Sequence, residues 1–390
     1  MNSFDVAIVG GGIIGTSIAF ELASADLRVV VLDRQEPGLE SSWAAAGMLS
    51  PGPDAPSALP LVPLAKDSLR RYPDFVASIE KASGKSTGFA RPGTLEIFTG
   101  QNAEQNRDAM LAQYRALDLP IESLALGAAR KLEPSLGHEV HTAALLAQEA
   151  TIEPRALIAA VIDACKNSGI TFEGGHEVTS FLRDGNRCTG VLTGGDKFTA
   201  RFVVLAAGSF CGTLGEAENR SARNSNSFAR FAPTHPVRGQ MLALRSPGVK
   251  ISHVIRSEHA YIVPRADGRL VAGSTLENVG FQKEVTAEGT KKILKGVREM
   301  IPALASAEIV ESWSGLRPGT PDNLPVIGNT EIEGLLVATG HYRNGILLAA
   351  ATARIVRDLI VTGNANFDIA PFSPRRFSAS QAEASASRGA

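Results

Sequence analysis

The sequence predicts an α/β fold in which a parallel sheet covered by helices is joined to a discontinuous α+β domain built on an antiparallel sheet. The first and last parts of the chain show strand–turn–helix patterns with continuous apolar strands, which are typical of parallel sheets. Between about 219 and 320, apolar and polar residues alternate instead, as in antiparallel strands. The 390 residues are enough for two domains, and the order of the patterns indicates that these interleave along the chain.

Residues 5–34 predict a β–α–β unit. A first apolar run ends in a glycine-rich turn. Ile14, Ile18 and Leu22 then recur every fourth residue, so they share one face of a helix. The run at 28–33, RVVVLD, is a second buried strand.

The turn of this unit carries the spacing Gly10-x-Gly12-x-x-Gly15, and Asp33 ends the next strand. Gly10 makes the tight turn, Gly12 lets a pyrophosphate approach the backbone, and Gly15 lets the helix pack on the strand. The helix N-terminus offers free N–H groups, and Asp33 can accept from a ribose hydroxyl. The pattern predicts a Rossmann-like site for an adenine dinucleotide; the alternative is a tight helix–strand turn with nothing bound. The motif does not separate NAD from FAD, but no second motif of this kind indicates a further NAD site.

The later elements follow from local patterns. Residues 41–60 are rich in glycine and proline but too apolar for a free linker. A strand is expected near 93–100, a helix followed by a strand over 153–172, and a buried strand at 201–210. Turn chemistry at 266–268, Ala-Asp-Gly, predicts a hairpin.

Near the C-terminus, GLLVA at 334–338 predicts a strand, and the apolar run after GHYRNG predicts a helix. Arg343 therefore lies in a glycine-bracketed turn between two buried elements, where a cation needs an anionic partner. The Ser/Ala-rich residues from 371 to 390 are expected to form a flexible tail.

The composition excludes several classes of function. With 44% apolar and 20% charged residues and a net charge of −1, the chain has the profile of a soluble globular protein without a field that attracts nucleic acid or a membrane. No apolar run is long enough to span a bilayer, and no signal peptide is visible, so a cytoplasmic location is expected. Three widely spaced cysteines predict neither disulfides nor a zinc site. His138 and His141 lack a third ligand, and no metal is expected.

Four further segments resemble the FAD-dependent D-amino acid oxidase family and, within it, are most similar to the glycine oxidase group of thiamine biosynthesis. They are SSWAAAGML (41–49), VVLAAGSF (203–210), WSGLRPGTPDNLPVIG (313–328) and GHYRNGILLA (340–349). The resemblance extends over about residues 3–375 and favours FAD. It implies an FAD-binding domain at 1–85, 150–218 and 320–370, and a substrate domain at 86–149 and 219–319.

The resemblance also implies cofactor contacts. The positions where the family holds the ADP half and the isoalloxazine are Gly10, Gly12, Ile13, Ile14, Gly15, Asp33, Arg34, Ser41, Ser42, Ala46, Gly47, Met48, Val178, Ala207 and Gly208. The positions where the family places a helix N-terminus under the flavin are His341, Tyr342, Arg343, Asn344, Gly345, Ile346 and Leu347. Reduced flavin is anionic at its N1–C2=O edge, which backbone N–H groups and a helix dipole stabilise. Related sarcosine oxidases link FAD to a cysteine in the segment matching GLRPG; this segment has none, so noncovalent FAD is expected.

The substrate end centres on Arg317, a guanidinium in a segment too apolar for a solvated face. From the residues alone, a bound carboxylate and an internal ion pair, for instance with Asp322, are equally good explanations. The resemblance implies that Arg317 binds the carboxylate of an amino acid and that the Tyr261 hydroxyl assists; the alternative for Tyr261 is a packed strand residue. Arg343 is expected to be a secondary contact beside Arg317, with its backbone near the amine.

These implications amount to oxidative deamination of glycine or small D-amino acids by hydride transfer to flavin N5. The expected products are a 2-oxo acid, ammonia and, with dioxygen as electron acceptor, hydrogen peroxide. Three alternatives stay open at this point: a D-amino acid dehydrogenase that reduces a quinone, an oxidase of sarcosine or other N-methyl amino acids, and a non-catalytic flavoprotein. Relatives are commonly homo-oligomers.

Overall fold

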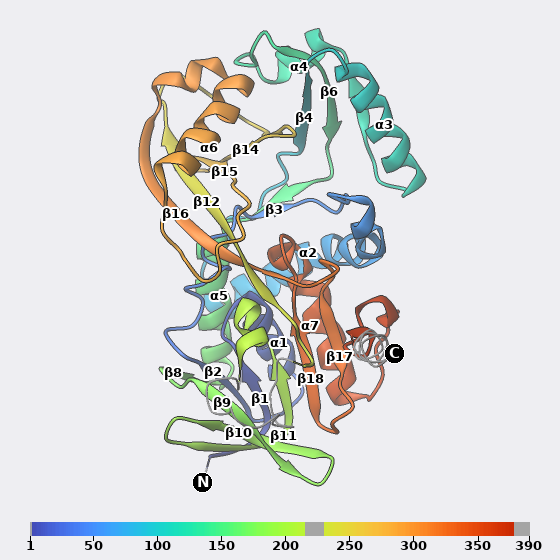
Figure 1. Ribbon diagram of the computed structural model, residues 1–390, viewed down its shortest axis with the longest axis vertical. Coiled ribbons are helices and arrows are strands. Elements are labelled where there is room, and N and C mark those ends of the chain that lie inside the picture. Colours follow the sequence, from blue (N-terminus) through green and yellow to red (C-terminus); the bar gives the residue numbers. More distant parts are fainter. Residues whose placement is uncertain (1, 215–229, 378–390) are drawn as a thin grey trace, which may run out of the picture.

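The structure is a computed structural model, and it describes residues 2–214 and 230–377. The described residues form two eight-stranded sheets and one two-stranded sheet. In Figure 1 the first sheet and its helices occupy the lower half of the molecule and the second sheet the upper half.

The first sheet has the order β17-β18-β11-β1-β2-β8, with β10 and β9 continuing from β11. Its strands are β1 Asn2–Val9, β2 Val29–Asp33, β8 Thr171–Gly174, β9 Val178–Asp184, β10 Arg187–Thr193, β11 Lys197–Leu205, β17 Val326–Asn329 and β18 Leu335–Thr339. β1 is parallel to β2 and β11, and β11 is parallel to β18, so the carboxyl ends of these four strands meet at one edge. In open parallel sheets this edge is where ligands bind.

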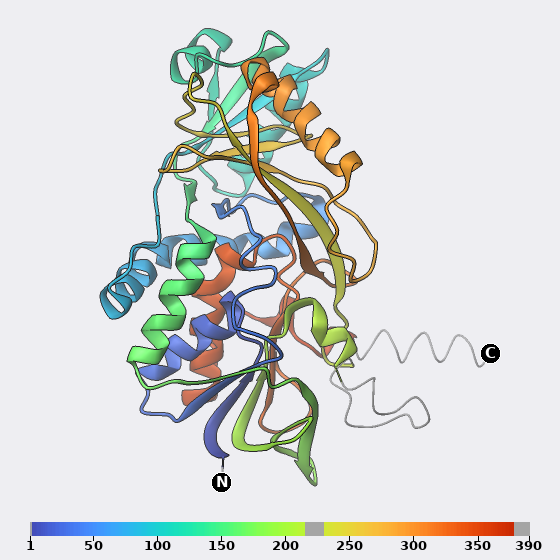
Figure 2. The ribbon, with the colours of Figure 1, turned by 90° about the vertical axis from the view of Figure 1, so that its left-hand side faces the viewer.

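Four helices cover one face of this sheet: α1 Ile13–Ala23, α2 Val62–Ser83, α5 Pro154–Asn167 and α7 Gly345–Val361. Figure 2 shows α1, α5 and α7 side by side against the strands. Their apolar faces and the inner strand residues form one core, in which Ile18, Leu22 and Val161 are fully buried. The β9–β10 hairpin packs over the opposite face, with Phe181 and Val191 in a second core. The predicted parallel, doubly covered sheet is therefore observed.

The second sheet has the order β16-β12-β15-β14-β13-β4-β6-β5. Its strands are β4 Thr94–Thr99, β5 Glu122–Leu124, β6 Val140–Leu146, β12 His235–Arg245, β13 Val254–Arg256, β14 Tyr261–Pro264, β15 Leu270–Gly273 and β16 Glu308–Gly319. The helices beside it are α3 Ala103–Ala116, α4 Leu126–Leu132 and α6 Ala287–Met300. All its pairings are antiparallel except that of β13 with β4, so the predicted antiparallel core is observed with one parallel exception.

Short elements connect the two sheets. β3 Met48–Leu49 pairs with β7 Ala150–Thr151 to form the third sheet. The 3-10 helices are η1 Pro56–Leu61, η2 Gly208–Thr213, η3 Pro302–Ser306 and η4 Ala370–Phe372. Each of the two large sheets draws its strands from separate parts of the chain, in the order that the alternating patterns predict. The residue boundaries given above for two domains remain a prediction.

The prediction of a flexible tail from residue 371 is wrong for residues 371–377, which pack against the rest of the protein. Phe372 is 1% exposed and belongs to the core of the first sheet, and Arg376 pairs with Asp322 at 2.8 Å. Ser/Ala-rich composition was a poor guide over 371–377 because this part, PFSPRRF, contains two aromatic rings that can be buried. Residues 378–390 lie outside the described part of the chain.

We predict that Phe372→Ala lowers the free energy of unfolding by about 3–5 kcal/mol, because it removes a fully buried ring and leaves a cavity. Urea unfolding of the purified protein measures this. A flexible tail from residue 371 would instead leave the stability of the variant unchanged, as expected for Arg375→Ala, the matched control at an exposed position.

Candidate functional site

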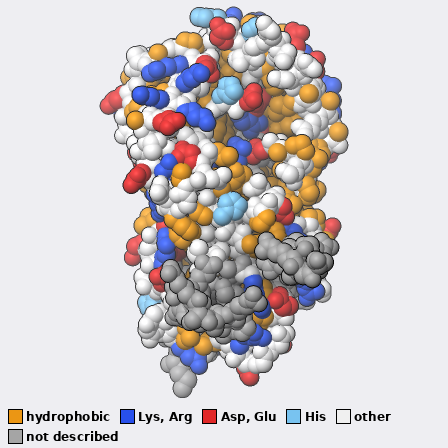
Figure 3. Space-filling model, in the orientation of Figure 1, with side chains coloured by type: hydrophobic (Ala, Val, Ile, Leu, Met, Phe, Trp, Pro, Cys, Tyr) orange, Lys and Arg blue, Asp and Glu red, His pale blue; other side chains and the backbone are white. Residues whose placement is uncertain are grey.

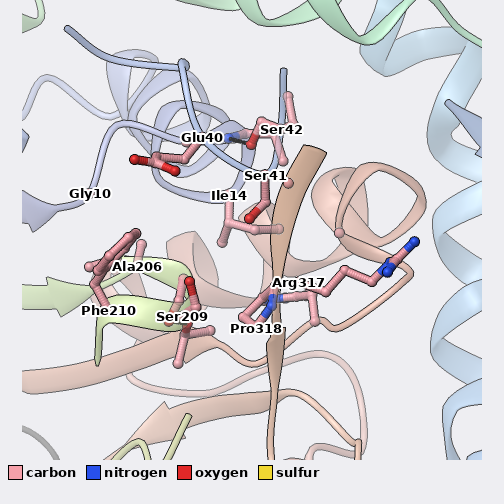
Figure 4. A pocket seen from close by; sticks show the side chains of 18 of the residues that line it. Gly10, Ile14, Glu40, Ser41, Ser42, Ala206, Ser209, Phe210, Arg317 and Pro318 are labelled. Carbon is pink, nitrogen blue, oxygen red and sulfur yellow. Dashed lines mark hydrogen bonds between the residues drawn. The ribbon is translucent and has the colours of Figure 1, made fainter. Parts of the chain in front are cut away.

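A large cavity lies at the carboxyl ends of β1, β2, β11 and β18, where the first sheet meets β12 and β16 of the second. Figure 4 shows it from close by. Gly10, Glu40 and Phe210 lie on one side of the view, and Arg317 extends from β16 away from them. The cavity therefore has two ends, which we call the dinucleotide end and the substrate end.

The glycine turn at the dinucleotide end is built as its spacing predicts. Gly10 has φ +108°, and a Cβ there would lie 2.5 Å from the carbonyl oxygen of Ala206. A Cβ on Gly15 would lie 2.0 Å from the carbonyl oxygen of Gly10, so glycine is needed for α1 to rest against the turn. A Cβ on Gly12 would lie 3.2 Å from Ser42 Oγ, on the wall of the cavity.

The N-terminus of α1 opens into the cavity without a competing anion. Its N-cap, Gly12, makes no side-chain capping bond, and its first turn has no acidic residue. Ser42 Oγ accepts from the Ile13 N–H at 2.9 Å. Free N–H groups and the positive end of the helix dipole bind phosphate, so this cradle fits the pyrophosphate of an adenine dinucleotide.

Asp33 is committed mainly to the turn itself. One carboxylate oxygen accepts from the Gly11 N–H at 2.8 Å and the other from the Gln35 N–H at 3.1 Å. Burial raises the pKa of Asp33, and these two hydrogen bonds oppose the rise. Asp33 also lines the cavity, so a contact with a ribose hydroxyl stays a prediction beside its observed role in holding the turn.

Two further residues at this end, Glu40 and Phe210, were not predicted from the sequence. Glu40 pairs with Arg34 at 2.8 Å, and the Arg34 guanidinium stacks 3.6 Å from the ring centre of Phe210. Both Glu40 and Phe210 line the cavity. Val178 at the start of β9 lies on the same wall. Glu40 belongs to none of the quoted segments, and Phe210 ends VVLAAGSF without a role that the sequence indicates; only the fold brings η2 beside the segment after β2.

The segment from 41 to 48 is tied to the second sheet by its backbone. The Ala46 carbonyl accepts from Arg265 at 2.6 Å, and the Ala44 carbonyl accepts from the Trp313 indole at 3.1 Å. A Cβ on Gly47 would lie 2.0 Å from the Ile152 carbonyl oxygen. The segment is a fixed wall of the cavity, and one of its main anchors is Arg265, which was also not predicted from the sequence.

A second helix N-terminus faces the same cavity. The N-cap of α7, Asn344, makes no side-chain capping bond, and the first turn is free of acidic residues. Tyr72 and Ser68 of α2 each donate to carbonyls of this turn, Ile346 and Leu347, at 2.6 Å. The helix start is therefore held rigidly and can stabilise negative charge placed against it.

Most of the predicted contacts share this one cavity. Its lining includes Gly10, Gly12, Ile13, Ile14, Asp33, Arg34, Ser41, Ser42, Ala46, Gly47, Met48, Val178, Ala207, Gly208, Tyr261, Arg317, His341, Tyr342, Arg343, Gly345 and Ile346. Gly15, Asn344 and Leu347 do not line it. Gly15 acts through packing and Asn344 begins the helix, so these residues shape the cavity from behind its wall.

Arg317 lies at the substrate end with neutral partners. Its guanidinium donates to the Thr275 carbonyl at 3.1 Å and to Ser274 Oγ at 2.8 Å. It rests on Gly239, where a Cβ would lie 2.1 Å from Arg317 Nη1. Within 2–214 and 230–377, no carboxylate lies at ion-pair distance from it, and burial lowers its pKa. The proposed internal pair with Asp322 is wrong, because that carboxylate binds Arg376.

Two tyrosines complete this end. Tyr261 is 8% exposed, and its hydroxyl donates to Met241 Sδ at 3.2 Å. Its side chain raises the pKa of Arg317, against the lowering effect of burial. Tyr342 has φ +47°. Its backbone N–H donates to the Pro318 carbonyl at 3.1 Å, and this hydrogen bond fixes its position.

Arg343 has an anion of its own. Its Nη1 lies 3.1 Å from Asp54 Oδ2, and both side chains are partly exposed. Arg343 lines the cavity, whereas Asp54 meets it from outside the cavity lining. The sequence required a partner for Arg343 but did not identify this one, which comes from a loop some 290 residues earlier.

Other features of the described residues add no second site. They contain no group of histidine, cysteine and acidic side chains that could hold a metal, and the three cysteines are buried free thiols. None of their helices is long and apolar enough to cross a membrane. On the face in Figure 3, basic and acidic side chains are interspersed.

Comparison with known proteins gives a consistent result. The family described as "DAO: FAD dependent oxidoreductase" matches residues 5–359. The chain is 34% identical to the glycine oxidase of Geobacillus kaustophilus, over 96% of this chain and 97% of that protein. It is 32% identical to the glycine oxidase of Pseudomonas putida, over 95% and 98%. The crystal structure of the G. kaustophilus glycine oxidase superposes with a TM-score of 0.87, covering 96% of this chain and 98% of that one.

The site contains one histidine whose titration is testable. His341 is 3% exposed, and its Nε2 lies 3.1 Å from Thr352 Oγ1; burial lowers its pKa from 6.5 to about 3. A histidine held neutral in the folded state stabilises the protein fully above its unfolded pKa, and the contribution is lost as the pH falls below 6.5. We predict a loss of up to about 1.4 kcal/mol per pH unit between 6 and 4 from this group.

The measurement is the free energy of unfolding against pH for the natural protein and His341→Gln. The variant should lose less stability than the natural protein on acidification. NMR of the natural protein should also show an imidazole that stays neutral down to pH 4. Equal slopes together with a ring that protonates near 6.5 would contradict the assignment.

Proposed function

The chain belongs to the DAO family of FAD-dependent oxidoreductases, and we propose that it is an oxidase that deaminates glycine or small D-amino acids. One observation carries the proposal. Arg317, a partly buried guanidinium with neutral partners, lies at the end of the cavity away from the glycine turn. The glycine oxidases most similar to this chain support the choice of substrate class.

The residues of the cavity fit a dinucleotide cofactor. The α1 N-terminus and Gly12 would hold the pyrophosphate, the wall from 41 to 48 would hold the isoalloxazine, and the α7 N-terminus would face its pyrimidine edge. When bound, FAD supplies a two-electron acceptor for a hydride. None of the cysteines lines the cavity, and Arg317 occupies the segment where related sarcosine oxidases have a linking cysteine, which supports noncovalent binding.

Arg317 would bind the substrate carboxylate. Its planar fork suits a carboxylate held through two hydrogen bonds. The guanidinium packs against Gly239, where a side chain would collide with it, and hydrogen bonds to Ser274 and Thr275 fix the orientation of the guanidinium. The cation is therefore positioned before the substrate binds. The Tyr261 hydroxyl, which lines the same cavity and donates to Met241 Sδ in this structure, would donate to the same carboxylate instead. Positioning of this kind lowers the entropic barrier to reaction.

The chemistry proposed at Cα needs no general base. The acidic side chains of the cavity lining are Asp33, Glu40 and Glu177. Asp33 bonds to the glycine turn, Glu40 lies on the same side as Gly10 in Figure 4, and Glu177 precedes Val178 on the wall of the dinucleotide end. His341 is neutral and bonded to Thr352, and its proton state is fixed by burial. A neutral amine whose Cα–H bond gives up a hydride fits this set of residues. The resulting imine would be hydrolysed in water to a 2-oxo acid and ammonia.

Dioxygen is the proposed electron acceptor, with hydrogen peroxide as its product. Two related activities differ in one step each: a dehydrogenase would pass the electrons to a quinone, and an N-methyl amino acid oxidase would prefer sarcosine. We also propose that the protein forms a homo-oligomer, is cytoplasmic and acts in thiamine biosynthesis.

We predict that Arg317→Ala costs about 2–5 kcal/mol in substrate binding, the range for removing one partner of a buried charge pair, while FAD content stays normal. Tyr261→Phe should cost about 1 kcal/mol, the value of one hydrogen bond. Steady-state kcat/KM on the best amine measures both. If Arg317→Ala keeps the natural kcat/KM, the carboxylate assignment fails, and an equally large loss in Tyr261→Phe would indicate a catalytic hydroxyl.

The proposed reaction is tested by anaerobic mixing with glycine, sarcosine, D-alanine, D-proline and L-alanine, followed by air. We expect glycine or a small D-amino acid to bleach the flavin absorbance and air to restore it with release of peroxide. Bleaching without rapid reoxidation by air would indicate a dehydrogenase. A flavoprotein that no amine bleaches would contradict the enzymatic function altogether.

A further inference from the structure

The cavity lining contains a second guanidinium near Arg317, and its charge is already neutralised by a carboxylate. Arg343 lines the same cavity as Arg317 and faces Asp54 at 3.1 Å. The two guanidiniums influence each other, because the charge of Arg343 contributes to the lowered pKa of Arg317. Arg317 and Arg343 thus place two positive charges near each other in the cavity lining. Among the described residues, Arg343 has a carboxylate partner and Arg317 has none.

The loop that carries Asp54 is held in place from both directions. Ser50, at its start, bonds to Glu149 and to Arg256, and the latter pairs with Glu96 at 2.5 Å. Glu149 is 4% exposed, so this anchor is a buried network of charges.

The tip of the loop is equally confined. A Cβ on Gly52 would lie 1.9 Å from Tyr114 Oη, and prolines at 51 and 53 restrict the backbone on each side. On its far side the loop runs directly into η1. Asp54 is therefore presented to Arg343 by a loop whose position is fixed by residues outside the cavity lining.

We propose that Asp54 is a specificity-determining residue: by neutralising Arg343, it restricts the substrate end to compounds with a single carboxylate. This rests on the proposed function, in which Arg317 takes the substrate carboxylate. A second carboxylate on the ligand must then compete with Asp54 for Arg343 and meets its negative charge. Without Asp54, Arg343 becomes a second anion site near Arg317, and dicarboxylates gain an attractive partner while losing a repulsive one.

The test measures binding and does not depend on turnover. Malonate and its monoamide, malonamate, have nearly the same shape but differ by one negative charge. Dissociation constants for both are determined from perturbation of the flavin absorbance of the oxidised holoenzyme. The quantity of interest is the preference for malonate over malonamate in the natural protein and in Asp54→Asn.

We expect the natural protein to bind malonamate more tightly than malonate, and the preference to shift toward malonate by about tenfold in Asp54→Asn, because one repulsive charge is lost and one charge pair is gained at a partly exposed site. The double variant Asp54→Asn/Arg343→Gln should lose the gain. The matched control is Asp5→Asn, which removes an acid from an exposed pair with Arg28 outside the cavity lining and should leave the preference unchanged.

Three results would overturn the proposal. These are an unchanged preference in Asp54→Asn, an equal gain in Asp5→Asn, or no measurable malonate binding to the Asp54→Asn holoenzyme. Failure of the oxidase reaction is recognised separately, because it appears as flavin that no amine bleaches even where malonate and malonamate are distinguished.

Discussion

The organisation of the site depends on the positive charge of Arg317, which the described protein leaves without a carboxylate. An uncompensated, largely desolvated cation is costly, and burial accordingly lowers its pKa. Its neutral hydrogen bonds to Ser274 and Thr275 fix its orientation but do not cancel its charge. A ligand carboxylate would neutralise this charge. The unfavourable free energy of desolvating Arg317 in the unliganded protein is therefore offset when the ligand binds, which favours binding.

The position of Arg317 relative to the dinucleotide end depends on how the two sheets are held against each other across the cavity. Arg317 belongs to the second sheet, whereas the two uncapped helix N-termini belong to the first. The hydrogen bonds of Arg265 to Ala46 and of Trp313 to Ala44 join the wall from 41 to 48 to the second sheet. They are backbone-directed bonds from largely buried side chains, which hold position better than exposed ion pairs do.

The sequence predicted those parts of the site that follow from local rules. The Gly10 turn, the α1 start and the α7 start each combine a strand end, glycine and an apolar helix within a short stretch, so their geometry is largely set by neighbours in the chain. Glu40, Phe210, Arg265 and Asp54 were missed for the opposite reason. Phe210, Arg265 and Asp54 each contact a partner that is distant in sequence, and only the assembled fold supplies that partner. Glu40 pairs with nearby Arg34 but lies in a loop without a recognisable motif.

The ion pairs around the site also explain why Arg317, rather than another arginine, stays free. Asp322 follows Arg317 closely in sequence, yet it binds Arg376 from the segment at 371–377 that composition assigned to a tail. Asp54 in the same way binds Arg343, which lines the cavity with Arg317. The carboxylates of Asp322 and Asp54 thus each pair with an arginine other than Arg317. The C-terminal segment is folded because Phe372 is buried, and it thereby brings Arg376 to Asp322. Packing far from the cavity therefore contributes to the charge that the cavity presents.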